Sequence, residues 1–213
     1  MAAKRWAATI VALLAETTKQ KEKTMKTTAA GYSVIDKALH WAMAVMIVGM
    51  LVSGLVMEDL QPLALKFQVI QLHKSFGLLV LVLAFTRVFW RFTNPAPRLP
   101  EGAPAWQKVA AHGTHLALYG LMFVMPFSGW LMSDAKGYHP NMFGLPVPVL
   151  GSVDRAAGHM LGEIHEYAAF VLMGLIALHF GAALFHHFIL KDDILNRMLA
   201  ARCGKGGGCC CKH

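Results

Sequence analysis

Four histidines lie at the ends of apolar stretches, at spacings that suit the binding of a metal-containing cofactor. His165 and His179 are 14 residues apart. On one helix they lie within about 40° of the same face and roughly 21 Å apart along the axis. His40 and His73 open two further apolar stretches. Ionisable side chains inside a membrane are costly, so a functional role is the first hypothesis, and hydrogen bonding to neighbouring helices is the alternative.

The composition indicates that these histidines belong to membrane helices. The 213 residues are 56% hydrophobic and 15% charged, with a mean hydropathy of +0.47, which is too apolar for a soluble domain of this size. We therefore expect an all-α integral membrane four-helix bundle over residues 31–199, between a basic leader (1–30) and a Gly/Cys-rich tail (200–213). The four windows that predict spans are Leu39 to Met57, Phe76 to Phe92, His115 to Ser133 and Tyr167 to Phe188.

The distribution of charge predicts the orientation of these spans. The net charge of +8 raises the possibility of nucleic acid binding, but 16 of the 20 lysines and arginines fall on the side that holds both termini and the second loop. The acidic residues divide equally between the sides, as the positive-inside rule allows. We therefore expect cytoplasmic termini and no nucleic acid partner. Cys203 and Cys209–Cys211 then face a reducing compartment, and the absence of a CxxCH motif excludes covalent c-type haem.

Alternating helix direction sorts the histidines into two pairs. His40 and His179 fall near the cytoplasmic face, and His73 and His165 near the external face. Two imidazoles on facing helices suit a six-coordinate haem iron, whereas zinc prefers four close ligands. The sequence therefore predicts two non-covalent haem b groups with bis-histidine ligation, the alternative being that all four residues serve packing. Glycines that could give the cofactors room are Gly49, Gly54, Gly77, Gly120, Gly129, Gly174 and Gly181.

Three further features accompany the pairs. Arg87 lies 14 residues after His73, at the level of the cytoplasmic pair, where it could bind a haem propionate or snorkel towards the interface. Among the other histidines, His115 and His186 are the candidates for contact with haem or quinone. An external loop over 136–162, which contains FGLPVPVLG, could cap a cofactor, dock a partner or lie at the membrane interface.

The sequence resembles the bacterial cytochrome b561 family, whose relatives include the b-type subunits of nickel-iron hydrogenases. The resemblance covers roughly Tyr32 to Leu199 and implies a bacterial inner-membrane protein that uses the four histidines as haem ligands. The matching residues are His40-Trp41, QLHKSFG around His73, Arg87, FGL with Pro146, His165-Glu166, and His179 followed by ALFHH and Lys191-Asp192.

The resemblance implies electron transfer between an external donor and the quinone pool, with ubiquinone as the acceptor. Superoxide is the donor it suggests, which would make the chain a superoxide:ubiquinone oxidoreductase. Lys74, Lys136 and Arg155 are expected near the external haem, where they could attract this anion. The alternatives are a cytochrome b subunit that anchors a partner hydrogenase or dehydrogenase, and a structural haem-bearing subunit. No G-x-G-x-x-G or P-loop motif occurs, so bound nicotinamide is not the electron source.

Overall fold

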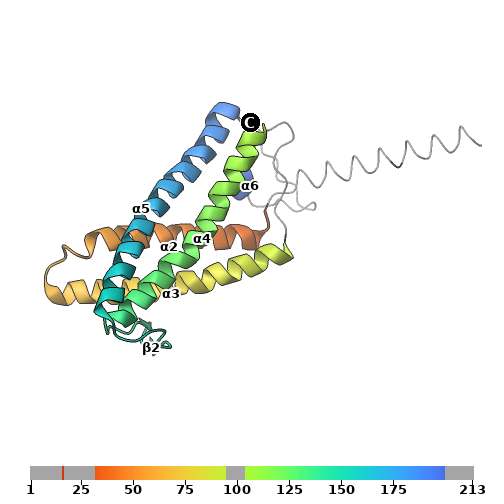
Figure 1. Ribbon diagram of the computed structural model, residues 1–213. Coiled ribbons are helices and arrows are strands. Elements are labelled where there is room, and N and C mark those ends of the chain that lie inside the picture. The colour runs from red at the N-terminus through yellow and green to blue at the C-terminus, as the bar shows by residue number, and fades with distance from the viewer. Residues whose placement is uncertain (1–15, 17–31, 95–103, 200–213) are drawn as a thin grey trace, which may run out of the picture.

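Four long helices make up most of the structure (Figure 1). The computed structural model describes residues 16, 32–94 and 104–199, so the expectations for the leader and the cysteine-rich tail lie outside the described residues, Glu16 excepted. Each long helix is long and apolar enough to cross a membrane, and the last of these spans continues to Leu190. The predicted all-α membrane bundle is therefore confirmed. The helices are α2 (Val34–Val56), α3 (Leu63–Thr93), α4 (Ala105–Ala135) and α5 (Arg155–Phe185).

Side-chain caps fix the first residues of α2 and α5. Ser33 and Asp36 form a capping box, in which each side chain accepts a hydrogen bond from the other residue's backbone N–H. The Asp154 carboxylate likewise accepts from two backbone N–H groups in the first turn of α5. Because α5 begins at Arg155, the external loop ends at Asp154, and its predicted end at Gly162 was wrong. The first turns of α5 carry polar residues and so lie before the apolar window.

The other spans also extend beyond their apolar windows. Helix α3 begins at Leu63, well before Phe76, because helical structure continues into polar flanks that hydropathy alone does not include. Helix α4 continues through Pro126. Helix α5 passes into a π-helical turn, η1 (His186–Leu190), and a short helix, α6 (Ile194–Leu199), follows.

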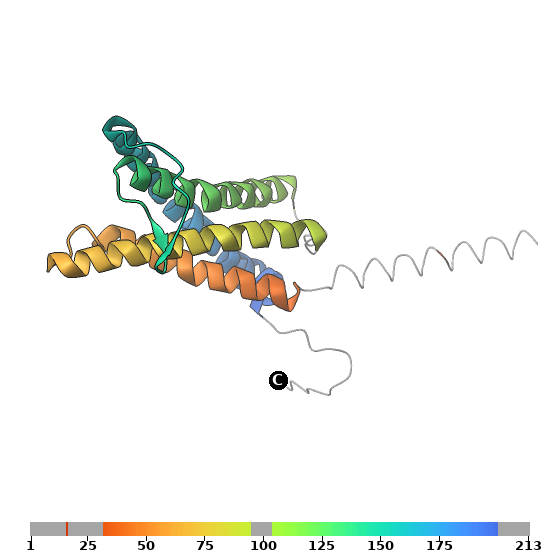
Figure 2. The same ribbon diagram turned by 90° about the horizontal axis from the view of Figure 1, so that it is seen from below.

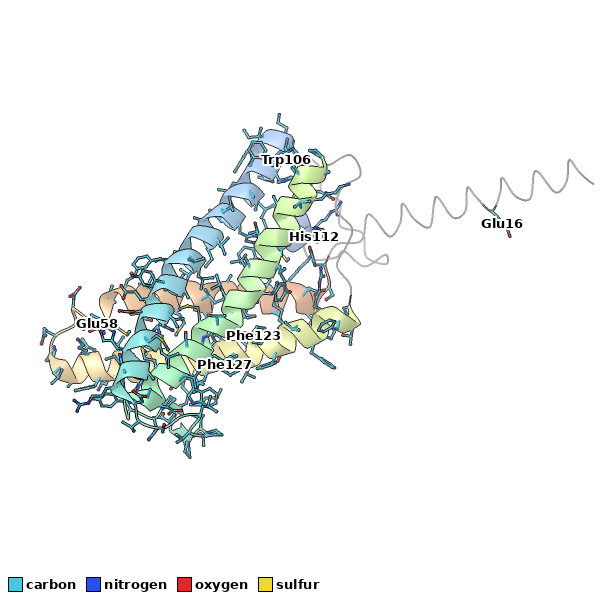
Figure 3. The ribbon with its side chains drawn as sticks, viewed as in Figure 1. Glu16, Glu58, Trp106, His112, Phe123 and Phe127 are labelled. Atoms are coloured by element: carbon cyan, nitrogen blue, oxygen red, sulfur yellow. The ribbon has the colours of Figure 1, made fainter. Side chains whose placement is uncertain are left out.

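The long helices form two hairpins that cross each other (Figure 1). Helix α4 packs closely along α5, and α3 contacts both α2 and α4, whereas α2 and α5 make few contacts among the described residues. A buried core of Met43, Val80 and Ala84 joins α2 to α3 at mid-height, with Phe123 of α4 packed against it. Figure 3 places Phe123 near the crossing, with Glu58 and Trp106 towards opposite ends of the bundle.

A small β-hairpin lies on the side predicted to be external, where it crosses α3 (Figure 2). Its strands are β1 (Asn141–Met142) and β2 (Leu145–Pro146), paired antiparallel. Phe143 and Gly144 at the turn both have positive φ, as tight hairpin turns favour. The buried Ser75 of α3 donates to the Asn141 carbonyl and accepts from the Phe143 N–H, so the hairpin is fixed to the bundle.

Candidate functional site

The four histidines meet as the two pairs that helix direction predicts. The ring centroids of His40 in α2 and His179 in α5 are 6.2 Å apart, and those of His73 in α3 and His165 in α5 are 6.4 Å apart. We call them the cytoplasmic pair and the external pair, after their predicted orientation. A metal–imidazole bond is about 2 Å long and the nitrogen lies about 1 Å from the ring centre, so two imidazoles on opposite sides of one metal have centroids about 6 Å apart. Both pairs therefore have the spacing that bis-imidazole ligation of one iron requires.

Serine hydroxyl groups hold both rings of the external pair. Nδ1 of His73 lies 2.9 Å from Oγ of Ser53 in α2, and Nδ1 of His165 lies 3.0 Å from Oγ of Ser128 in α4. Sequence reasoning did not select these serines. Each is a polar residue directly before a glycine inside an apolar span, and that repeated dipeptide was the available signal.

Two glycines leave space for the imidazole rings of His73 and His165. A Cβ at Gly129 would lie 3.1 Å from Cε1 of His165, and a Cβ at Gly54 would lie 3.5 Å from Cε1 of His73. Gly77 instead faces the Met50 side chain. Two of the seven glycines suggested from sequence therefore lie against a paired histidine. At the other four of these seven positions a Cβ would meet no atom within 4 Å: Gly49, Gly120, Gly174 and Gly181.

A cavity of about 610 Å³ is lined by both histidines of the external pair and by residues of all four long helices. This volume falls within the range of small-molecule and cofactor pockets. Lys74 and Lys136 line it, whereas Arg155 is exposed at the start of α5 and lies outside the lining. The lining also includes Glu58, Pro140, Glu163 and Glu166. The lining of the cavity therefore combines apolar side chains and both imidazoles with lysine and glutamate side chains.

The cytoplasmic pair has different neighbours. A guanidinium nitrogen of Arg87 lies 3.2 Å from Nδ1 of His40, and Nε of Arg87 donates to the Tyr119 hydroxyl at 3.3 Å. The ring of His115 lies 5.4 Å from that of His179, centroid to centroid. Arg87 therefore lies at the level of His40 and His179, as its spacing predicted. His115 is close to the pair.

His186 occupies a different position from His115. It lies in η1, where Nδ1 is 2.5 Å from an Asp192 carboxylate oxygen. The preceding helix is therefore joined to the residues that lead into α6. Nearby, Nε1 of Trp41 donates to the Met198 carbonyl at 3.3 Å, which ties α6 to the start of α2.

A buried carboxylate anchors the external loop. Asp134 is fully buried at the end of α4, where it accepts from the Leu150 N–H at 2.8 Å and lies 2.9 Å from Nδ1 of His139. Nζ of Lys74 donates to the Tyr138 carbonyl at 3.2 Å. Sequence reasoning did not select Asp134, which directly follows the window His115 to Ser133. Its burial and its contacts with Leu150 and His139 indicate that it organises the loop.

Four membrane-spanning helices that bring histidines together in two pairs have the architecture of a b-type membrane cytochrome. The chain belongs to the prokaryotic cytochrome b561 family, whose model matches residues 31–201. Membership in this family implies haem b binding and electron transfer in a bacterial membrane.

The chain is similar to several curated proteins over most of its length. It is 39% identical to cytochrome b561 homolog 2 of Escherichia coli (strain K12) over 171 residues, which is 79% of this chain and 90% of the relative. It is 28% identical to a protein named probable superoxide oxidase CybB of Yersinia pestis over 174 residues, 81% of this chain and 98% of the relative. Cytochrome b562 of Cereibacter sphaeroides is 30% identical, with 81% and 97% covered.

Proposed function

We propose that this protein binds two non-covalent haem b groups and passes electrons across the bacterial inner membrane, between an external donor and the quinone pool. His40 and His179 hold the group nearer the cytoplasm, and His73 and His165 hold the external one. The observation that carries this proposal is the meeting of the histidines in two pairs near opposite ends of α5, at 6.2 and 6.4 Å. Bound haem b supplies reversible one-electron chemistry.

The contact of Arg87 with His40 would not be compatible with iron ligation by that imidazole. A guanidinium group only donates hydrogen bonds, so its contact makes Nδ1 of His40 an acceptor and places the proton of the neutral ring on Nε2. If Nε2 of His40 held the iron, the proton of the ring would lie on Nδ1, and if Nδ1 held it, the lone pair that Arg87 contacts would be used. In both cases Arg87 would be free of the ring and could bind an anionic haem propionate.

Superoxide is the proposed donor. The support is the name of the Yersinia pestis relative and the presence of Lys74 and Lys136 in the wall of the external cavity. The glutamates in the same wall restrict attraction of the anion to the immediate surroundings of the lysines. Two superoxide ions give up two electrons and leave as two molecules of O₂. These two electrons, with two protons, reduce one quinone to quinol.

The decisive experiment mixes superoxide with the purified, oxidised, haem-loaded protein and ubiquinone while the haem spectrum is followed. We expect fast haem reduction followed by quinol formation, slower at high salt. Lys136→Glu should slow the reduction several-fold. Arg155→Glu, which makes the same change of charge outside the cavity lining, is the matched control and should slow it less. A haem that superoxide leaves oxidised would refute the donor assignment.

Haem content tests the proposed sites separately from the donor. A pyridine haemochrome measurement should find two b haems per chain and none covalently attached. His73→Ala and His165→Ala should remove the same haem, and His40→Ala and His179→Ala the other, as redox titration would show. If the His73 and His165 variants lost different haems, the pairing would be wrong.

The external loop supports a second candidate function, that of a cytochrome b subunit serving a partner enzyme. Its side chains Phe143, Leu145, Val149 and Val153 are between 52% and 69% exposed. An apolar surface of this kind suits either a protein partner or the membrane interface. Co-purification of a dehydrogenase or hydrogenase that reduces the haems, together with no reaction with superoxide, would favour this function.

A further inference from the structure

A serine–glycine dipeptide occurs near the external end of two different helices, and each dipeptide contacts one histidine of the external pair. Ser53 and Gly54 of α2 contact His73 of α3, at 2.9 Å to Nδ1 and 3.5 Å to Cε1. Ser128 and Gly129 of α4 contact His165 of α5 in the same way, at 3.0 and 3.1 Å. The two dipeptides also share a methionine three residues after the glycine, in SGLVM and SGWLM. Two unrelated helices thus present the same arrangement to the two rings.

The hydrogen of each hydroxyl group is already used. Oγ of Ser53 donates to the Met50 carbonyl at 2.9 Å, and Oγ of Ser128 donates to the Met125 carbonyl at 3.0 Å. A serine hydroxyl has one hydrogen, so towards each histidine Oγ can only accept. With the hydroxyl hydrogen donated to the carbonyl, Nδ1 carries the proton and the lone pair of the neutral ring lies on Nε2.

We propose that Ser53-Gly54 and Ser128-Gly129 are matched positioning elements for the external haem. Each glycine leaves space for the imidazole beside its helix, and each serine fixes the tautomer that presents Nε2 to the iron. This proposal rests on the proposed ligand role of His73 and His165. The hydrogen bond at Nδ1 also makes the imidazole a stronger electron donor, which stabilises the oxidised iron.

The two haem sites consequently differ in how their ligands are held. At the cytoplasmic pair, the neighbour of His40 is a cationic donor, Arg87, which would leave the ring on iron binding and so would not hold the bound ligand. At the external pair both ligands face neutral acceptors. Loss of one serine hydroxyl should therefore raise the midpoint potential of the external haem and leave the cytoplasmic haem unchanged.

The test is a redox titration of haem-loaded Ser53→Ala and Ser128→Ala, with each haem followed by its own spectrum. Both variants should show a more positive external midpoint and about 10- to 100-fold weaker binding of that haem. Ser53→Thr, which keeps the hydroxyl, should restore both values. Thr86→Val is the matched control, since the Thr86 hydroxyl donates to the Val82 carbonyl on an exposed part of α3, and it should move neither midpoint.

Several outcomes would overturn the proposal. An unchanged external midpoint in both alanine variants, equal shifts of both haems, or a Ser53→Thr variant that behaves like Ser53→Ala would each show that the hydroxyl groups do not act through the ligands. Failure of the proposed haem sites is recognised separately, because His73→Ala would then retain the external haem. If His73→Ala loses that haem and the serine variants do not shift it, the positioning role alone is wrong.

Discussion

Replacement of Gly129 by alanine should weaken the external haem site through one added methyl group. The new Cβ would lie 3.1 Å from Cε1 and 3.3 Å from Nδ1 of His165, inside ordinary van der Waals contact, so the ring must retreat by a few tenths of an ångström. The hydrogen bond from that ring to Ser128 opposes the movement. Gly113, in the same helix, provides the control, because a methyl group added there would meet no atom within 4 Å.

The expected magnitude follows from two opposing terms. Alanine in place of glycine inside a helix contributes about 1 kcal/mol, and this gain is common to Gly129→Ala and Gly113→Ala. Overpacking against a fixed neighbour costs about 1–3 kcal/mol, and only Gly129→Ala bears it. Because iron would hold the ligated ring in place, whereas the haem-free ring can move aside, this cost falls on the haem-bound state. It corresponds to about 5- to 150-fold weaker binding of the external haem in Gly129→Ala.

The assay is transfer of haem from each variant to an excess of a haem-scavenging protein, with the two haems distinguished by their spectra. Gly129→Ala should lose the external haem first and retain the cytoplasmic one. Gly113→Ala should retain both. Equal retention of the external haem by the two variants would refute the argument that space beside His165 limits the site.

Three further changes test other contacts. Arg87→Met should weaken the cytoplasmic haem and lower its midpoint potential, because a nearby cation disfavours the oxidised iron; an unchanged titration would mean that Arg87 does not lie near that haem. Asp134→Asn should destabilise the external loop by about 1.5–3 kcal/mol through loss of a charge-assisted bond with His139, measured as faster proteolysis of the loop, and unchanged cleavage would contradict it. Trp41→Phe should lose the bond to the Met198 carbonyl and so speed hydrogen exchange across α6, whereas wild-type exchange would show that this bond does not hold the helix.

The pairing of the histidines could be predicted from the sequence, because the direction of the helices alternates from one span to the next. Helix direction alone assigns each end of a span to one face of the membrane. The ends of the helices could be predicted less well. Hydropathy identifies the residues that suit the hydrocarbon core, but the helices continue beyond them. The Asp154 cap was visible in the sequence, yet the polar turns after it resembled a loop. Contacts such as Ser53 with His73 depend on how helices rotate against each other, and no local pattern gives that rotation.

The sparse contact between α2 and α5 has a consequence for how the protein is made. The cytoplasmic histidine pair spans these two helices, which make few contacts of their own among the described residues. We therefore expect a newly inserted chain to form its helical hairpins by direct packing. If His40 and His179 bind haem as proposed, that haem would stabilise the association of α2 with α5, since ligand binding and folding are coupled. Cells starved of haem should degrade this protein soon after synthesis, because quality-control proteases remove incompletely assembled chains. Its abundance would then follow haem supply even at constant transcription.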